Sequence, residues 1–290
     1  MKLLLLKTAL ATSLVALSSM AMADLKLEVF YAKPEAFAVT STLVMGDKEA
    51  ILIDTGFSRA DALRIAAQVL DSQKKLTTIL ISQADPDYYF GVSTLKQIFP
   101  DVKVVAPAQV LAEIKEKLDT KLQVWSPQLG TNKPLVPMVL PTALDKPELK
   151  LEGETIEIRD SEGKYGNRPY VWIPSLKTIT GNVNVYGNMH LWTADSQSKE
   201  ARQAWQKQLD EMLALNPVRV IPGHQISGAK EDKQLIVFNK NYLVKFEQVL
   251  ASSKTSAEII KKMVQLYPNL QGKDNLEFSA KVNTGEVEWK

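Results

Sequence analysis

Short runs of β-forming residues alternate with helical patterns along this 290-residue chain, and that order limits its fold more than any other feature. Residues 49–54 form a compact apolar run that enters Thr55 and Gly56, and residues 60–70 follow a helical period behind Ser58, a suitable N-terminal cap. Two more apolar strands are expected at 78–81 and 102–105, with a helix at 92–98 between them. A β-α-β-α order is typical of layered α/β folds and argues against a sandwich of strands alone.

The rest of the chain follows the same kind of pattern. Further strands are expected at 25–32, 37–45, 154–159, 170–173, 178–180 and 219–221. Helices are expected at 199–215, around 235–249 and at 256–266, so that two helices close the chain. Four prolines after position 133 predict a loop-rich crossing over 125–147. The apolar face expected on the helix at 60–70 consists of Leu63, Ala66, Ala67 and Leu70.

Residues 1–23 are predicted to be a signal peptide and to lie outside the fold. They carry Lys2 and Lys7, no acidic residue, a short apolar stretch broken by Thr and Ser, and a small-x-small cleavage pattern that ends at Ala23. The short apolar stretch argues against a membrane anchor. We therefore expect a periplasmic or secreted protein with one domain over 24–290, and the lack of cysteine suits that compartment.

The charge balance excludes some classes of partner. Without Lys2 and Lys7 the 35 basic residues become 33, which equals the number of acidic residues. A neutral chain lacks the basic surface that nucleic acids and acidic membranes attract. We therefore expect neither nucleic acid nor, after signal cleavage, a membrane as a partner, and the expected partner is a small molecule or a protein.

Polar side chains follow several of the predicted strands directly. They are Asp54, the group Gln83, Asp85 and Asp87, then Asn182, and finally His224. In layered α/β folds the loops at strand ends commonly bind ligands. The alternative is that Asp and Asn at these positions form turns and cap helices, and for Asp54 alone we favour that interpretation.

Taken together, in this order and spacing, these motifs resemble the metallo-β-lactamase fold superfamily over nearly all of residues 24–290. The Asp-Thr-Gly turn of that family corresponds to residues 54–56, its metal loop to residues 83–91, its Gly-Asp to Gly181-Asn182 and its final Gly-His to Gly223-His224. Residues 186–195 are similar to the segment that follows the Gly-Asp in one secreted branch. The resemblance implies an α/β fold of the four-layer αββα sandwich type.

The resemblance also implies a site for two zinc ions, but most of its ligands are missing. Family ligand positions hold Gln83, Asp85, Tyr88 and Asn182, a further one falls near Gly163, and only Asp87 and His224 match by identity. Amides are weak zinc ligands, and a tyrosine must first lose a proton with a pKa near ~10. Two adjacent divalent ions also need a negative bridge, which Asn182 does not supply. A dizinc hydrolase is therefore not expected.

Two interpretations of the cleft stay open. In the first, the chain is a non-catalytic binding or scaffold protein whose ligand cleft contains Gln83, Asp85, Tyr88, Tyr89, Asn182 and His224. In the second, Asp85, Asp87 and His224 hold one divalent cation, and Asp87 accepts a proton in the hydrolysis of an ester, lactone, β-lactam or phosphoester. A metal-free loop in which the two carboxylates accept hydrogen bonds favours the first.

Aromatic residues and the second histidine have two interpretations as well. The residues Tyr88, Tyr89 and Phe90, with Trp125 and Trp192, could form an apolar wall of the cleft. Core packing is the ordinary alternative, and we favour it for Phe90 and Trp205. His190 stands beside Leu191 and Trp192 and is expected to be a hydrogen-bonded packing residue.

Overall fold

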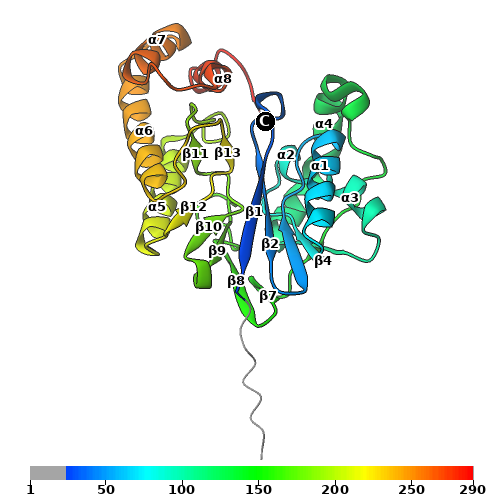
Figure 1. Ribbon diagram of the computed structural model, residues 1–290. Helices are drawn as coiled ribbons and strands as arrows, with labels where there is room; N and C mark the ends of the chain where they lie inside the picture. Colours follow the sequence, from blue (N-terminus) through cyan, green and yellow to red (C-terminus); the bar gives the residue numbers. More distant parts are fainter. Residues whose placement is uncertain (1–23, 290) are drawn as a thin grey trace, which may run out of the picture.

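Two mixed β-sheets form the centre of the molecule (Figure 1). The computed structural model describes residues 24–289, and the predicted signal peptide at 1–23 lies outside the described residues. The first sheet has six strands in chain order: β1 (Lys26–Tyr31), β2 (Thr40–Met45), β3 (Glu49–Ile53), β4 (Lys75–Leu80), β5 (Lys103–Ala106) and β6 (Thr142–Ala143). Strands β3 to β6 run parallel, as expected where helices connect neighbouring strands.

The second sheet has the order β12-β10-β9-β8-β7. Its strands are β7 (Glu148–Leu151), β8 (Glu154–Arg159), β9 (Tyr170–Ile173), β10 (Thr178–Thr180) and β12 (Arg219–Val220). A separate parallel pair, β11 (Tyr186–Gly187) and β13 (His224–Gln225), extends from this half and carries His224. The predicted strands at 154–159, 170–173 and 178–180 are confirmed at both ends.

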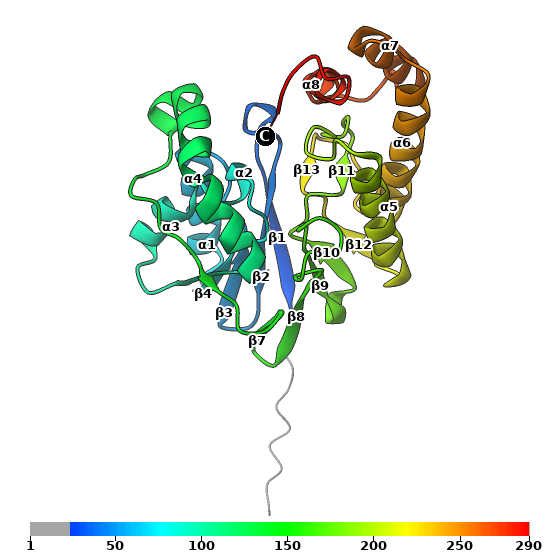
Figure 2. The same ribbon diagram turned by 180° about the vertical axis from the view of Figure 1, so that it is seen from behind.

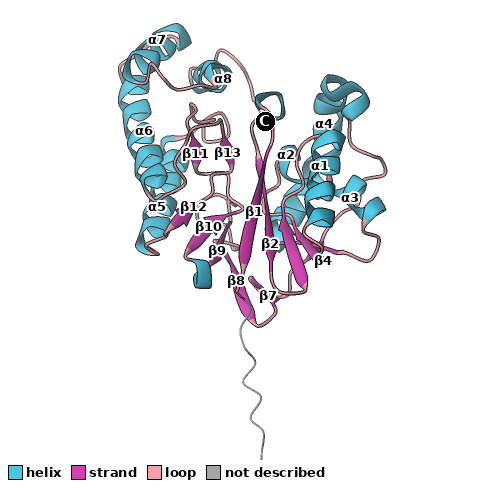
Figure 3. Ribbon diagram, viewed as in Figure 1, coloured by secondary structure: helices cyan, strands magenta, loops and turns pink. Residues whose placement is uncertain are grey.

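Helices cover the outer face of each sheet (Figures 2 and 3). On the first sheet lie α1 (Arg59–Asp71), the short α2 (Pro86–Tyr89), α3 (Val92–Ile98) and α4 (Ala108–Leu129). On the second lie α5 (Lys199–Ala214) and α6 (Gln234–Ala251), followed by α7 (Ser256–Leu266) and α8 (Lys273–Asn283). Three short 3-10 turns complete the elements, at Pro34–Ala36, Gly130–Asn132 and Pro174–Leu176. No helix among residues 24–289 combines the length and apolar character needed to span a bilayer.

Three apolar layers hold these four layers of secondary structure together. Alternation along β3 shows how: Ala50 and Leu52 pack against the helices of the first half, whereas Ile51 and Ile53 belong to the layer between the sheets. Side chains of a strand point alternately to its two faces, so a strand buried on both faces reads as a continuous apolar run. A third cluster lies between the second sheet and α5 to α8. The predicted four-layer αββα sandwich is confirmed.

The apolar face predicted for α1 is displaced by one residue. Leu63 is 51% exposed and Leu70 is 61% exposed, whereas Ile65 and Val69 are buried. The predicted and the buried strips have the same helical spacing, so periodicity alone fits both. The predicted strip is 63, 66, 67 and 70, and the buried one is 62, 65, 66 and 69. Ser58 caps α1 as expected, and the structure adds a reciprocal bond from the Ser58 backbone to the Asp61 side chain, which completes a capping box.

The loop predicted over 125–147 begins later, because α4 continues to Leu129 with Pro127 inside its last turn. The buried side chains of α4, Val110, Leu111 and Ile114, all lie in its first half. Its second half keeps a partly buried apolar strip, Leu118, Leu122, Trp125 and Leu129, that packs against the same core, so the helical pattern runs on past Trp125. The chain also closes with three helices rather than two, since α8 follows α7 after Gly272, whose φ is 65°.

Candidate functional site

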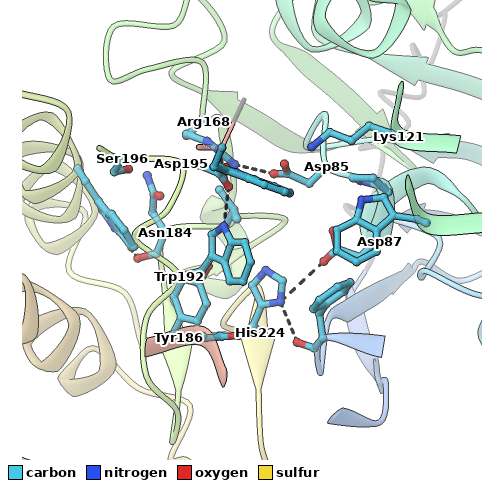
Figure 4. Close-up of a pocket in the computed structure, with 17 residues that line it drawn as sticks. Asp85, Asp87, Lys121, Arg168, Asn184, Tyr186, Trp192, Asp195, Ser196 and His224 are labelled. Atoms are coloured by element: carbon cyan, nitrogen blue, oxygen red, sulfur yellow. Dashed lines mark hydrogen bonds and ion pairs between the residues drawn. The ribbon is translucent and has the colours of Figure 1, made fainter. Parts of the chain in front are cut away.

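A cleft between the two halves brings together three of the six polar residues expected at strand ends, Asp85, Asp87 and His224 (Figure 4). It encloses about 730 Å³, part of it open to solvent, and an adjoining polar space shares Asp85, Lys121 and Arg168 with it. Asp85 ends the loop after β4, Asp87 lies in the short helix α2, and His224 comes from β13 of the other half. Of the predicted cleft residues, Gln83, Tyr88, Tyr89 and Asn182 are buried below or beside this space and do not line it.

Tyr88 and His224 contact each other where the family resemblance expects metal ligands. The Tyr88 hydroxyl lies 3.1 Å from His224 Nε2 and donates to the backbone oxygen of Asn182 at 3.0 Å. Tyr88 is 1% exposed. Burial and the neighbouring Asp87 raise the pKa of Tyr88 well above its ordinary value, so the phenol keeps its proton. A neutral phenol therefore covers the imidazole nitrogen that a metal ion would need.

The hydrogen bonds of His224 settle its tautomer. Its Nδ1 lies 3.0 Å from the backbone oxygen of Phe37, which can only accept, so Nδ1 carries the proton. Burial lowers the pKa of His224 to about 4, so the ring is neutral and Nε2 is an acceptor facing the Tyr88 hydroxyl. Tyr186 stacks on the other side of the imidazole with ring centroids 5.0 Å apart. Nδ1 is thus bonded to Phe37, and Nε2 is covered by the Tyr88 hydroxyl, whose single proton it shares as an acceptor with the backbone oxygen of Asn182.

Gln83 and Asn182 are turned into the backbone of the fold. The Gln83 amide nitrogen donates to the backbone oxygen of Pro169 at 2.7 Å, and its Oε1 has no partner among the described residues. Asn182 donates to the backbone oxygen of Ile221 at 2.9 Å and accepts from the backbone nitrogen of Val185 at 3.0 Å. The Gln83 amide therefore joins the loop after β4 to the second half, and the Asn182 amide joins strand ends within the second half.

Asp85 forms an ion pair that the sequence did not indicate. Arg168, just before β9, places Nη1 2.5 Å from Asp85 Oδ2 and Nη2 3.5 Å from Asp195 Oδ2. Burial alone would raise the pKa of Asp85, but the charges of Arg168 and Lys121 outweigh it and hold the pKa below its usual value. Asp195 also accepts from the indole nitrogens of Trp192 and Trp289. Asp85 is therefore ionised, and the positive charge of Arg168 balances its negative charge.

Asp87 differs from Asp85, because it has no cationic partner. It is 6% exposed, and its Oδ2 has no hydrogen-bond partner among the described residues. The nearest ring nitrogen, His224 Nδ1, is 3.8 Å away and donates to Phe37 instead. Burial, with the nearby charge of Asp85, raises the pKa of Asp87 well above its ordinary value. A buried carboxyl group without a partner is uncommon, and this one faces the cleft (Figure 4).

Tryptophans form much of the apolar wall of the cleft. The expected Trp125 and Trp192 line it, together with Trp205 and Trp289. Trp205 is also 3% exposed and packs in the core, as expected. Trp289, near the chain end, stands at a T-shaped angle to Trp192 and carries the Lys121 ammonium 5.3 Å from its ring centroid. By contrast, Tyr89 and Phe90 belong to the core of the first half.

The remaining sequence candidates lie away from the cleft. His190 is fully buried, with Nδ1 2.9 Å from the Tyr242 hydroxyl, and burial lowers its pKa to about 4. Gly163 lies in a turn against Gln109 and does not line the cleft. Arg168, Lys121 and Trp289 are among the cleft residues that sequence reasoning missed, and none of them stands in a motif or directly after a predicted strand.

These donors do not fit the zinc ions that the fold family implies. Among residues 24–289 no group of three or more His, Cys, Asp or Glu side chains is placed to hold a metal ion. His224 Nδ1 donates to Phe37 and its Nε2 is covered by the Tyr88 hydroxyl, the Asp85 carboxylate is paired with Arg168, and Asn182 is bonded within the backbone. A divalent ion would have to displace each of these contacts, and the tyrosine and amides offer it no charge in return.

Replacing Tyr88 by phenylalanine is expected to destabilise the protein by about 1–2 kcal/mol, because the backbone oxygen of Asn182 loses its buried donor. Tyr89 provides a matched control, since its hydroxyl is buried without a partner among the described residues and Tyr89→Phe should be neutral or slightly stabilising. Urea denaturation of both variants measures the difference. Equal effects at the two positions would contradict a bonding role for the Tyr88 hydroxyl.

Comparison with known proteins agrees with this architecture. A family model described as the metallo-beta-lactamase superfamily matches residues 34–167. A metallo-beta-lactamase family protein from Thermus thermophilus superposes with a TM-score of 0.58 at 15% identity, covering 90% of this chain and 93% of that one. A metallo-beta-lactamase from Pontibacter korlensis gives a TM-score of 0.55 at 14% identity, with coverages of 76% and 94%.

A larger enzyme shares the fold as well. An inverting sec-alkylsulfatase from Pseudomonas sp. superposes with a TM-score of 0.57 at 13% identity over 89% of this chain and 50% of that one. No curated protein matches the sequence. The αββα layers, the motif order and the family model that matches residues 34–167 agree, so this chain has the fold of the metallo-β-lactamase superfamily.

Proposed function

We propose that this protein is a non-catalytic binding or scaffold protein that uses the cleft of a metallo-β-lactamase fold without its metal ions. The observation that carries the proposal is the contact between the Tyr88 hydroxyl and His224 Nε2, reinforced by the bond from Tyr88 to the Asn182 backbone. A buried phenol with a raised pKa takes the position of a metal ligand and stabilises the site as it stands. The cleft above it stays open to a ligand.

Metal analysis tests this proposal directly. Protein purified without added metal should contain well under one equivalent of zinc or manganese per chain, and a chelator should leave its melting temperature unchanged. A metal ion bound only to the native state would stabilise that state by mass action. Its removal by the chelator would then lower the melting temperature. Two tightly bound zinc ions per chain would contradict the proposal.

A metal-dependent hydrolase is the alternative, and one observation favours it. Asp87 is a buried, cleft-facing carboxyl group with a raised pKa, which is common for groups that transfer protons in active sites. The alternative needs one cation held by Asp85, Asp87 and His224, yet Asp85 is already neutralised by Arg168. Screening ester, lactone, β-lactam and phosphoester substrates with Mn²⁺, Zn²⁺ and Ca²⁺ tests it, and turnover that Asp87→Ala abolishes would support the hydrolase over the binding protein.

The location and partners belong to the same proposal. We propose a periplasmic or secreted protein, because residues 1–23 carry the composition of a signal peptide. We further propose that residues 24–290 act as one domain, since an apolar layer joins the two sheets. A small molecule or a protein segment in the cleft is the proposed partner, and nucleic acid is not, given the balanced charge of the chain without its first 23 residues.

A further inference from the structure

The segment that follows α8, residues 284–289, reaches from the helices of the second half to the cleft. Figures 1 and 2 show it leaving α8 and passing to the top of β1, between the two halves. Trp289 in this segment lines both the cleft and the adjoining polar space. The segment therefore lies where it can control the access of a ligand to both.

Contacts with the second half hold Trp289 in this position. Its indole nitrogen donates to Asp195 Oδ1 at 2.6 Å, and its backbone oxygen accepts from Gln197 Nε2 at 2.9 Å. Its ring meets Trp192 and Phe278 at T-shaped angles, with centroids 6.0 Å and 5.1 Å away. Trp192 donates to the other oxygen of Asp195, so this carboxylate is held by both indoles. Hydrogen bonds between N–H donors and an ionised carboxylate are stronger than bonds between neutral groups.

A cation from the first half meets the face of the same indole. Lys121 lies on α4 and reaches the cleft from the side opposite Asp195 (Figure 4). Its ammonium lies 5.3 Å from the ring centroid of Trp289 and forms no ion pair with a carboxylate among residues 24–289. A cation is attracted to the face of an indole by the negative potential of the ring. Trp289 therefore bridges the two halves across the cleft, with its nitrogen on Asp195 and its face toward Lys121.

The bridge can open without unfolding a helix or a strand. The backbone nitrogens of Glu286 and Val287 donate to the Lys281 oxygen and fix the start of the segment on α8. The side chain of Glu288 is exposed and has no hydrogen bond among the described residues, and Trp289 is only partly buried. Segments held by a few contacts at one residue open at a small free energy, far below that of global unfolding.

Building on the proposed binding function, we infer that Trp289 is a latch of the cleft. When it is closed, as in this structure, it narrows the entrance between Asp195 and Lys121, and its release widens the entrance for a ligand. A site that is open for only part of the time binds more slowly in proportion to the open fraction. Loss of the latch should therefore speed both association and dissociation. If Trp289 were only a part of the wall, its loss would speed dissociation and leave association unchanged.

Stopped-flow fluorescence with N-phenyl-1-naphthylamine, a neutral apolar dye that becomes bright in apolar surroundings, separates the two roles. We expect Trp289→Ala to raise the association rate constant of the dye about tenfold, which corresponds to about 1.4 kcal/mol for the lost contacts. Glu288→Ala changes the neighbouring exposed residue and should change neither rate, so an effect of Trp289→Ala alone assigns the dye to the cleft. An association rate within twofold of the unaltered protein would overturn the inference, as would the absence of dye binding to every variant.

A second variant tests the bridge from the other half. Lys121→Met removes the cation from the face of Trp289 and leaves the contacts with the second half in place, so dye association should become several-fold faster. Because Lys121 acts through the indole, the double variant should bind the dye no faster than Trp289→Ala alone. Independent effects that multiply in the double variant would show that Lys121 does not hold Trp289 and would overturn the inference.

This experiment fails separately from the proposed function. If dye association ignores Trp289→Ala and metal is absent, the latch is wrong while a metal-free binding protein stands. If metal analysis finds two zinc ions, or if a metal-dependent turnover appears, the proposed function is wrong whatever the dye does. Melting temperatures of Trp289→Ala and Lys121→Met accompany the kinetics, and the Lys121 arm keeps the test decisive should Trp289→Ala fold poorly.

Discussion

Gly223→Ala is expected to destabilise the protein by at least about 3 kcal/mol and to disturb the position of His224. A Cβ atom at Gly223 would lie 1.9 Å from the backbone oxygen of Asn182 and 2.6 Å from the Tyr88 hydroxyl. The first contact is with backbone, which cannot rotate away as a side chain does. Since the φ angle of Gly223 is not in the left-handed region, the lack of a side chain matters here for space and not for conformation.

The neighbouring hydrogen bonds leave the backbone at Gly223 little freedom to move. Its nitrogen donates to the Val185 oxygen and its oxygen accepts from the Thr40 nitrogen, both at 2.9 Å, so it connects the two halves of the molecule beside the cleft. Gly285→Ala is a suitable control, because nothing lies within 4 Å of its Cβ and only its φ of +77° is unfavourable, at about 1–2 kcal/mol. Urea denaturation of both variants tests the prediction, and a Gly223→Ala loss no larger than the control would contradict it.

The strands were predictable from the sequence because their signal is local. Residues 154–159 alternate in burial, and residues 170–173 are continuously apolar. Both runs end at polar residues or proline, so the strand pattern and the strand-ending residues agree. The helical face of α1 was not predictable in the same way, since two strips with equal spacing differ only in which one meets the sheet. That choice is made by tertiary packing and by the capping box at Ser58.

The candidate site was likewise predictable only where its signal is local in the sequence. The motif positions of Asp85, Asp87 and His224 predicted that they would meet at one cleft, and they do. The hydrogen bonds of the site could not be predicted from the sequence, because the contact of Tyr88 with His224 joins residues 136 positions apart. Arg168 and Trp289 also reach the cleft through long-range packing, and no local pattern marks either residue. Such contacts depend on the assembled fold, so the sequence indicated which metal ligands are lost but not what replaced their interactions.

Asp54 offers the clearest case of a residue whose properties come from burial rather than from its motif. Its carboxyl group is 1% exposed and accepts from the backbone nitrogen and the hydroxyl of Ser82, both at 2.7 Å. Burial raises its pKa from 3.8 to about 7, although the two bonds from Ser82 oppose the shift. The interpretation of Asp54 as a simple turn former accounts for its φ of 65° but not for this buried titrating group.

The raised pKa makes folding stability depend on pH at Asp54. Between about pH 4 and pH 7 the folded state holds a proton on Asp54 that the unfolded state has released, so stability falls as pH rises through this window and levels off above it. The full shift corresponds to about 4 kcal/mol. The side-chain amide of an Asp54→Asn variant resembles the protonated acid, since it can accept from the Ser82 nitrogen, and asparagine also tolerates a positive φ.

We therefore expect Asp54→Asn to exceed the unaltered protein in stability by about 1.6 kcal/mol at pH 5, where the unfolded aspartate has already ionised, and by about 4 kcal/mol at pH 8. Urea denaturation at both pH values measures this, with Asp145→Asn, outside the cleft and away from Asp54, as the control that should show no such difference. A constant offset between the two proteins at both pH values would show that Asp54 does not titrate as its burial indicates. If the expected gain is found, the native carboxylate lowers stability at neutral pH, and a residue kept at such a cost beneath the cleft is better explained by the function of the cleft than by folding.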